Sequence, residues 1–84
     1  MHLSVVTPEN VLFQGEASIV RLPGEAGRFE ILQCHAPLLS TLTAGRVSAT
    51  VPEAEDFEID IEGGFVEVSN GNISLCIIAA PKHP

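Results

Sequence analysis

FEIDIEGGFVEVSNGNISLCII, residues 57–78, decides the fold class because its apolar residues recur at every second position over most of its length. In 57–62, aromatic and branched side chains alternate with acidic ones, as in a strand with one face buried and the other in water. Asn70-Gly71 is the strongest two-residue turn signal in the chain. The stretch therefore predicts a half-buried strand followed by a β-hairpin.

The same period of two extends outward from this stretch along the rest of the chain. No window of eleven or more residues shows the spacing of an amphipathic helix. Glycines and prolines divide the chain into short segments, and Gly63-Gly64 is expected to end the strand before it through a positive φ or a bulge. Seven to ten short strands predict an all-β sandwich or barrel.

The length of 84 residues predicts one domain, residues 1–84, because so short a chain cannot build two cores. The longest apolar stretch, 75–81, is far shorter than the ~20 residues that span a bilayer. The first residues lack the pattern of an export signal. We therefore expect a soluble protein without an export signal, and two reduced thiols at Cys34 and Cys76.

The charge excludes several classes of partner. Four Lys and Arg against eleven Asp and Glu give a net charge of −7. Such a chain repels phosphate backbones and anionic membrane surfaces, so nucleic-acid binding and direct lipid anchoring are not expected. A protein partner stays open.

The adjacent Cys34 and His35 raise the question of a thiol enzyme. Neighbours in an extended chain project to opposite faces, so the two groups would meet only in a special turn, and no third group orients them. His2, His83 and Cys76 lie too far along the chain to complete a metal site. A pKa of Cys34 near the usual ~8.5 would leave that thiol inert.

Two further motifs also favour structure over chemistry. The acidic run in 53–62 lacks the loop spacing and central glycine of a calcium loop, and its alternation indicates the solvated face of a strand. PGEAG, residues 23–27, has no Gly-Lys-Ser/Thr sequence and is a turn by composition. No metal and no cofactor are expected.

HAPLL, residues 35–39, leaves two interpretations open. A proline stiffens the backbone and the leucines beside it suit a protein interface. Alternatively, the leucines belong to the core and His35 is merely exposed or hydrogen-bonded.

Taken together, VTPENVLFQGE, RLPGEAGRFEIL, HAPLLSTLTAG and GGFVEVSNGNISLCIIA resemble a known family in order and spacing. The chain resembles the amino-terminal domain of the epsilon subunit of the proton-translocating ATP synthase, called delta in mitochondria. The resemblance covers nearly the whole chain and implies a flattened ten-stranded β-sandwich.

The resemblance also implies a function without catalysis or bound ATP. Such a subunit joins the gamma subunit to the ring of membrane subunits, so that proton-driven rotation reaches the catalytic head. It would lie as a peripheral membrane protein on the cytoplasmic face of the bacterial inner membrane, or the equivalent organelle face. The implied gamma interface is Thr7, His35, Ala36, Pro37, Leu38, Thr41 and Leu42. The implied ring interface is Gly24, Glu25, Ala26, Gly27 and Arg28.

The chain departs from the family pattern in three places. Glu30, Gln33 and Cys34 replace a glycine, a proline and a small or polar residue, and Arg28 stands where a smaller or acidic residue is common. The family usually continues into two helices that inhibit ATP hydrolysis, whereas this sequence stops at Pro84. We therefore expect no inhibitory arm, and the prolines around 81–84 favour a natural end over an excised domain.

A rotor subunit needs a wide interface, so we expect an exposed apolar patch on the sandwich that includes Val6, Leu38, Leu39 and Leu42. The alternative is a freestanding β-sandwich module that binds a ligand or another protein. The absence of Trp and Tyr, which commonly supply stacking surfaces, argues against a sugar or other small ligand.

Overall fold

The computed structural model describes residues 1–33 and 35–81, and these form strands and loops only. The strands are β1 (His2–Val6), β2 (Val11–Glu16), β3 (Ile19–Gly24), β4 (Gly27–Leu32), β5 (Leu38–Leu42), β6 (Gly45–Thr50), β7 (Phe57–Ser69) and β8 (Asn72–Ala79). The predicted all-β class is confirmed. The expected number of ten strands is corrected to eight over the described residues. Nor does this part of the chain contain a helix long and apolar enough to cross a membrane.

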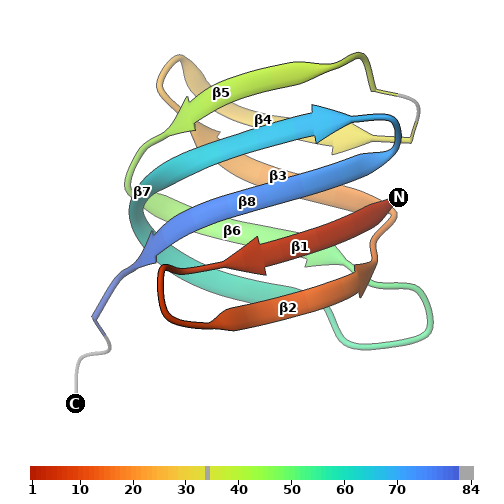
Figure 1. The fold of residues 1–84 in the computed structure, drawn as a ribbon, viewed down its shortest axis with the longest axis horizontal. Coiled ribbons are helices and arrows are strands. Elements are labelled where there is room, and N and C mark those ends of the chain that lie inside the picture. The colour runs from red at the N-terminus through yellow and green to blue at the C-terminus, as the bar shows by residue number, and fades with distance from the viewer. Residues whose placement is uncertain (34, 82–84) are drawn as a thin grey trace.

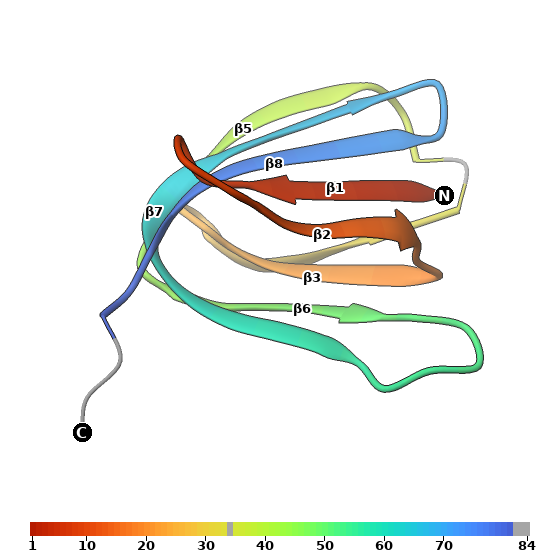
Figure 2. The same ribbon diagram turned by 60° about the horizontal axis from the view of Figure 1, so that its bottom comes forward.

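The strands form two layers that share β7 (Figure 1). One layer has the order β2-β1-β8-β7-β5, and the other contains β4, β3, β6 and the first half of β7. Figure 2 shows β7 curving from the second layer into the first. All pairings are antiparallel except that of β1 with β8, which joins the two ends of the chain in one sheet.

The bend in β7 joins two segments that the sequence analysis expected to be separate strands. Gly63-Gly64 was expected to end a strand, but β7 runs through both glycines from Phe57 to Ser69. The register with β8 shifts between Ile61 and Gly63, which marks a bulge. Gly64 has φ +152°, and a Cβ there would lie 2.8 Å from the Cα of Ile77. The glycine therefore lets one strand pass close to its neighbour and turn into the other layer.

The core lies between the layers and follows the predicted alternation. In β7, Ile61 is buried and Phe57 and Ile59 pack against the core, while the acidic residues between them are exposed. The strand β6 departs from this alternation, because Ser48 is only 8% exposed although Val47 and Ala49 on either side of it are buried. It lies between Arg21 of β3 and Glu58 of β7, whose longer side chains flank it. The fully buried large side chains include Leu3, Val5, Leu22, Ile31, Ile73 and Leu75.

The hairpin between β7 and β8 confirms the strongest turn signal of the sequence. Asn70 and Gly71 both have positive φ, +51° and +78°, as a two-residue type I′ turn requires. Ser69 pairs with Asn72 across the turn, so every inward side chain of β8 is placed in register with β7.

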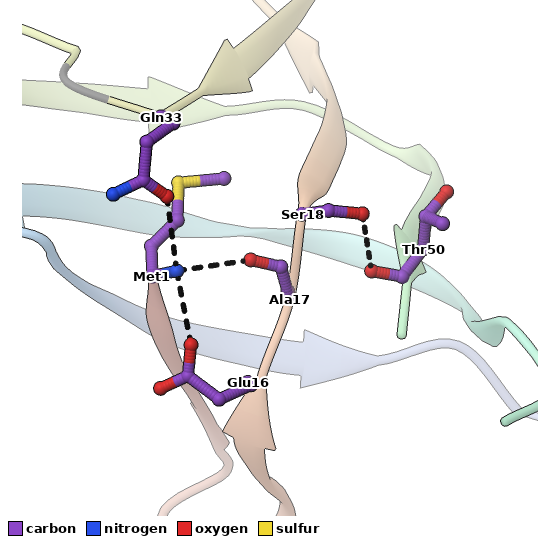
Figure 3. A network of polar contacts seen from close by, with 6 residues as sticks. All are labelled: Met1, Glu16, Ala17, Ser18, Gln33 and Thr50. Atoms are coloured by element: carbon purple, nitrogen blue, oxygen red, sulfur yellow. Dashed lines mark hydrogen bonds and ion pairs between the residues drawn. The ribbon is translucent and has the colours of Figure 1, made fainter. Parts of the chain in front are cut away.

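Polar contacts at Met1 connect the start of β1 to two other segments (Figure 3). The terminal ammonium donates to Glu16 Oε2 and to the Ala17 carbonyl, both at 3.1 Å, and to Gln33 Oε1 at 3.3 Å. Gln33, one of the departures from the family pattern, thus ties the end of β4 to β1. Glu30, another departure, forms an ion pair with Arg21 at 3.2 Å.

Candidate functional site

An apolar row crosses the outer face of the sheet β2-β1-β8-β7-β5. Strand register places Thr41 beside Phe65, Phe65 beside Cys76, Cys76 beside Val6, and Val6 beside Val11. Thr41, Phe65, Cys76 and Val6 point outward because the residues next to them along their strands fill the core. Val11 continues the row on the edge strand β2 through its pairing with Val6. Phe65 is 47% exposed and Val11 is 63% exposed. These five residues, called the apolar row below, make a continuous surface from segments that are distant in sequence.

Further side chains widen the apolar row. Ile78 lies two residues beyond Cys76 and is 57% exposed, and Leu39 lies two residues before Thr41 and is 71% exposed. A shallow depression of about 290 Å³ is lined by Phe65, Ile78, Thr7 and their neighbours. The outer face therefore presents apolar side chains to solvent, which is the general character of a protein-binding surface.

The predicted gamma-facing residues are divided between this face and one loop. Thr41 belongs to the apolar row, and Thr7 borders the depression at the end of β1. Thr7 is held in a tight turn, because its backbone nitrogen donates to the Asn10 carbonyl at 2.9 Å. His35, Ala36 and Pro37 are exposed in the loop before β5.

The leucines of this segment have three different environments. Leu39 is exposed, Leu38 is half-buried against the core, and Leu42 is only 3% exposed. The expectation that Leu42 contributes to an exposed patch is wrong, because its side chain fills the core between the layers. The second interpretation of HAPLL holds in part, since Leu38 packs against the core and His35 is exposed with its Nδ1 2.7 Å from the Ala36 carbonyl oxygen. The interpretation of HAPLL as a protein interface stays a prediction.

The predicted ring-facing residues form the turn between β3 and β4. Gly24 pairs with Gly27, so Glu25 and Ala26 occupy the tip, and Gly27 has φ +121°. The turn is anchored from below, because the backbone nitrogen of Thr43 donates to the carbonyl of Pro23 at 2.8 Å. A depression of about 490 Å³ separates the turn from the start of β5 and is lined by residues 24–29, His35, Leu38 and Ser40. The two predicted interfaces therefore meet at this depression.

A cluster of three charged side chains on β6 and β7 is paired in solvent. Arg46 contacts Asp60 at 3.0 Å and Glu58 at 3.5 Å. Hydrogen bonding to Asp60, then the charges of Asp60 and Glu58, raises the pKa of Arg46. The hydrogen bond from Arg46, followed by its charge, lowers the pKa of Asp60. A depression of about 520 Å³ is lined by these three side chains and extends to Pro81, and its charged groups already contact one another.

The described residues contain no group of three or more His, Cys, Asp or Glu side chains that could hold a metal ion. Cys76 is a half-buried free thiol in the apolar row. Cys34 and His83 lie outside the described residues, so the expectation of a reduced, unreactive thiol at Cys34 stays a prediction.

The sequence analysis missed most of the apolar row. The sequence did contain a signal for it, because β7 and β8 carry apolar residues at both odd and even positions. One alternate set of side chains fills the core, so the other set faces outward. The outward apolar residues of these strands are Phe65, Cys76 and Ile78.

Sequence comparison matches residues 1–81 to the family described as ATP synthase, Delta/Epsilon chain, beta-sandwich domain. The ATP synthase epsilon chain of Chlorobium limicola is 41% identical over 73 residues, which is 87% of this chain and 83% of the relative. That of Caulobacter vibrioides is 40% identical over 76 residues, covering 89% and 86%. That of Bordetella parapertussis is 39% identical over 75 residues, but the match spans only 54% of the relative.

Solved structures show the same fold at low identity. A chain of the Euglena gracilis mitochondrial ATP synthase, in a structure of OSCP, F1 and c-ring, superposes with a TM-score of 0.85 at 17% identity. The superposition covers 94% of this chain and 51% of that one. A chain of the Tetrahymena thermophila central stalk and c-ring has a TM-score of 0.78 at 14% identity, covering 92% and 62%.

Proposed function

The chain belongs to the family of ATP synthase delta and epsilon chains, matched through the β-sandwich domain of that family, and on this premise we propose that it is a coupling subunit of the rotor. It binds gamma through the outer face of the sheet β2-β1-β8-β7-β5 and the ring of membrane subunits through the turn at 24–28. It supplies no reacting group and no ATP site. It works as a peripheral membrane protein on the cytoplasmic face of the bacterial inner membrane or its organelle equivalent.

The apolar row is the observation that supports gamma binding. Strands lie about 4.8 Å apart and residues about 3.3 Å along them, so five strands by five residues cover on the order of 400 Å². A stable interface needs about 800 Å² on each partner. The contact must therefore extend beyond the row, and Thr7 and the loop of His35, Ala36 and Pro37 lie where it would continue.

The architecture suits the transmission of torque. Both proposed surfaces lie on one hydrogen-bonded body, because β5 contributes Thr41 to the apolar row and pairs through Leu42 with Gly24 at the turn. Strand pairing and a close-packed core resist deformation between the two surfaces. A load applied at the turn therefore reaches the outer face without a flexible linker between them.

Binding to purified gamma tests the proposal. Phe65→Ser should weaken binding about thirty-fold, the scale for loss of an aromatic anchor of about 2 kcal/mol. Leu32→Ser is the matched control, because Leu32 is also an exposed apolar residue, 50% exposed, but lies on β4 in the opposite layer. Both variants should keep the wild-type melting temperature to within a few degrees. Failure of the wild-type chain to bind gamma at micromolar concentration contradicts the proposal.

A further inference from the structure

Arg28 differs from the other arginines of the described residues in having no carboxylate partner. Arg21 pairs with Glu30 at 3.2 Å, and Arg46 pairs with Asp60 and Glu58. No carboxylate of the described residues forms an ion pair with Arg28, although the chain carries eleven acidic residues and a net charge of −7. An exposed guanidinium in so acidic a chain is left with free donors.

The structure also holds Arg28 in place. Its Nη1 donates to the carbonyl oxygen of Arg46 at 2.8 Å, which uses one of five N–H donors. The positive charge of Arg46 is offset by Asp60 and Glu58, so repulsion between the two arginines does not outweigh the hydrogen bond from Arg28. A guanidinium fixed in this way loses less conformational freedom when it binds a planar anion, and its remaining donors suit a two-pronged contact.

The surroundings of Arg28 provide room for a partner. It flanks the depression of about 490 Å³ between the β3–β4 turn and β5, whose lining includes Phe29 and Leu38. A protein loop can place an acidic side chain against Arg28 and shorter side chains in the depression. A phosphate-rich surface fits poorly, because one arginine is a small attraction against the repulsion of the whole chain.

We propose that Arg28 is a specificity residue for the ring, and that it receives the carboxylate of an Asp or Glu side chain on the ring loop that contacts the turn. This inference rests on the proposed function, since it assumes that the turn at 24–28 meets the ring. It adds the chemistry of the partner: an acidic residue at that contact.

The test measures binding of the full chain, in complex with gamma, to the purified ring from the same organism. Arg28→Gln should weaken ring binding about ten- to a hundred-fold, the range for a charge-assisted hydrogen bond, and leave gamma binding unchanged. Arg21→Gln is the matched control, because it removes the same charge from the neighbouring strand at an arginine that is already paired. Raising the salt concentration should weaken the wild type more than Arg28→Gln.

A second set of variants identifies the partner group. Each Asp and Glu of the exposed ring loops is replaced by its amide in turn. The ring variant that lacks the partner carboxylate should bind more weakly, and combining it with Arg28→Gln should weaken binding no further than either single change. Equal ring binding by Arg28→Gln and the wild type overturns the inference and leaves the proposed function standing. An equal loss of gamma binding by Arg28→Gln also overturns it, because the effect would then act through the fold. If the wild-type complex does not bind the ring, the ring part of the proposed function fails, and the inference fails with it.

Discussion

Replacing Gly64 by alanine should test whether the bend of β7 holds the two layers together. Gly64 has φ +152°, and the added Cβ would lie 2.8 Å from the Cα of Ile77 and would also clash with the carbonyl oxygen of Cys76. A strained φ costs about 1–3 kcal/mol, and forcing packed backbone apart costs about 1–3 kcal/mol more. We expect the free energy of unfolding to fall by about 2–6 kcal/mol, the sum of these two contributions.

Two other glycines separate the contributions to that loss. Gly71 has φ +78° but open space around its Cβ position, so Gly71→Ala should cost only the backbone strain, about 1–2 kcal/mol. At Gly63 a Cβ would meet its nearest atom at 3.5 Å, an ordinary contact, so Gly63→Ala should change stability by less than about 1 kcal/mol. The expected order of destabilisation is therefore Gly64, then Gly71, then Gly63.

Urea denaturation followed by circular dichroism measures the three differences. A chain of 84 residues has a total stability of about 4–13 kcal/mol at about 0.05–0.15 kcal/mol per residue, so Gly64→Ala removes a large share. Its melting temperature should fall by about 10 °C or more. If Gly64→Ala proves no worse than Gly71→Ala, the close approach of β7 to β8 does not limit residue 64, and the reasoning is wrong.

Two other sets of substitutions test which leucine lies in the core and whether the ion pair between Arg46 and Asp60 stabilises the fold. Leu42→Ala should lower the free energy of unfolding by about 2–5 kcal/mol, because Leu42 is 3% exposed. Leu39→Ala should lower it by less than about 0.5 kcal/mol, because Leu39 is 71% exposed. Similar losses at the two positions would contradict the assignment of Leu42 to the core and Leu39 to the surface. Asp60 has a lowered pKa in the folded chain, so its contribution to stability should be present above its unfolded value of about 3.8 and be lost as the pH falls through the folded value. Urea titrations between pH 2 and 7 should therefore show a shallower acid-side loss for Asp60→Asn than for the wild type, and identical pH profiles would show that the Arg46 contact is not formed in solution.

Local pattern was enough to predict the fold class and the division of most strands into inner and outer residues. Alternation in 57–62 correctly assigned Ile61 to the core and the acidic residues to solvent. Asn70-Gly71 correctly located a hairpin because the required positive φ depends on those two residues alone. The expected strand end at Gly63-Gly64 was wrong, because a glycine pair can end a strand or bend it, and only the packing of β7 against β8 distinguishes the two.

The candidate site was harder to predict for the same reason. HAPLL attracted attention as an odd segment, but its leucines divide between core and surface according to which layer β5 joins. The lack of an ion pair between Arg28 and the described carboxylates also depends on the register of β3, β4 and β6, which sets the carboxylates within reach of each arginine.

The sequence by itself determined an all-β chain, the inner face of most strands and the position of its sharpest turn, because these follow from the spacing of neighbouring residues. Only the tertiary structure decided that β7 serves both layers and that β1 lies parallel to β8. That arrangement brings residues from five strands into one apolar row and places Arg28 beside a depression, where no described carboxylate forms an ion pair with it. The physical reason is that pairing between distant strands depends on how the whole core closes, and no local pattern encodes that closure.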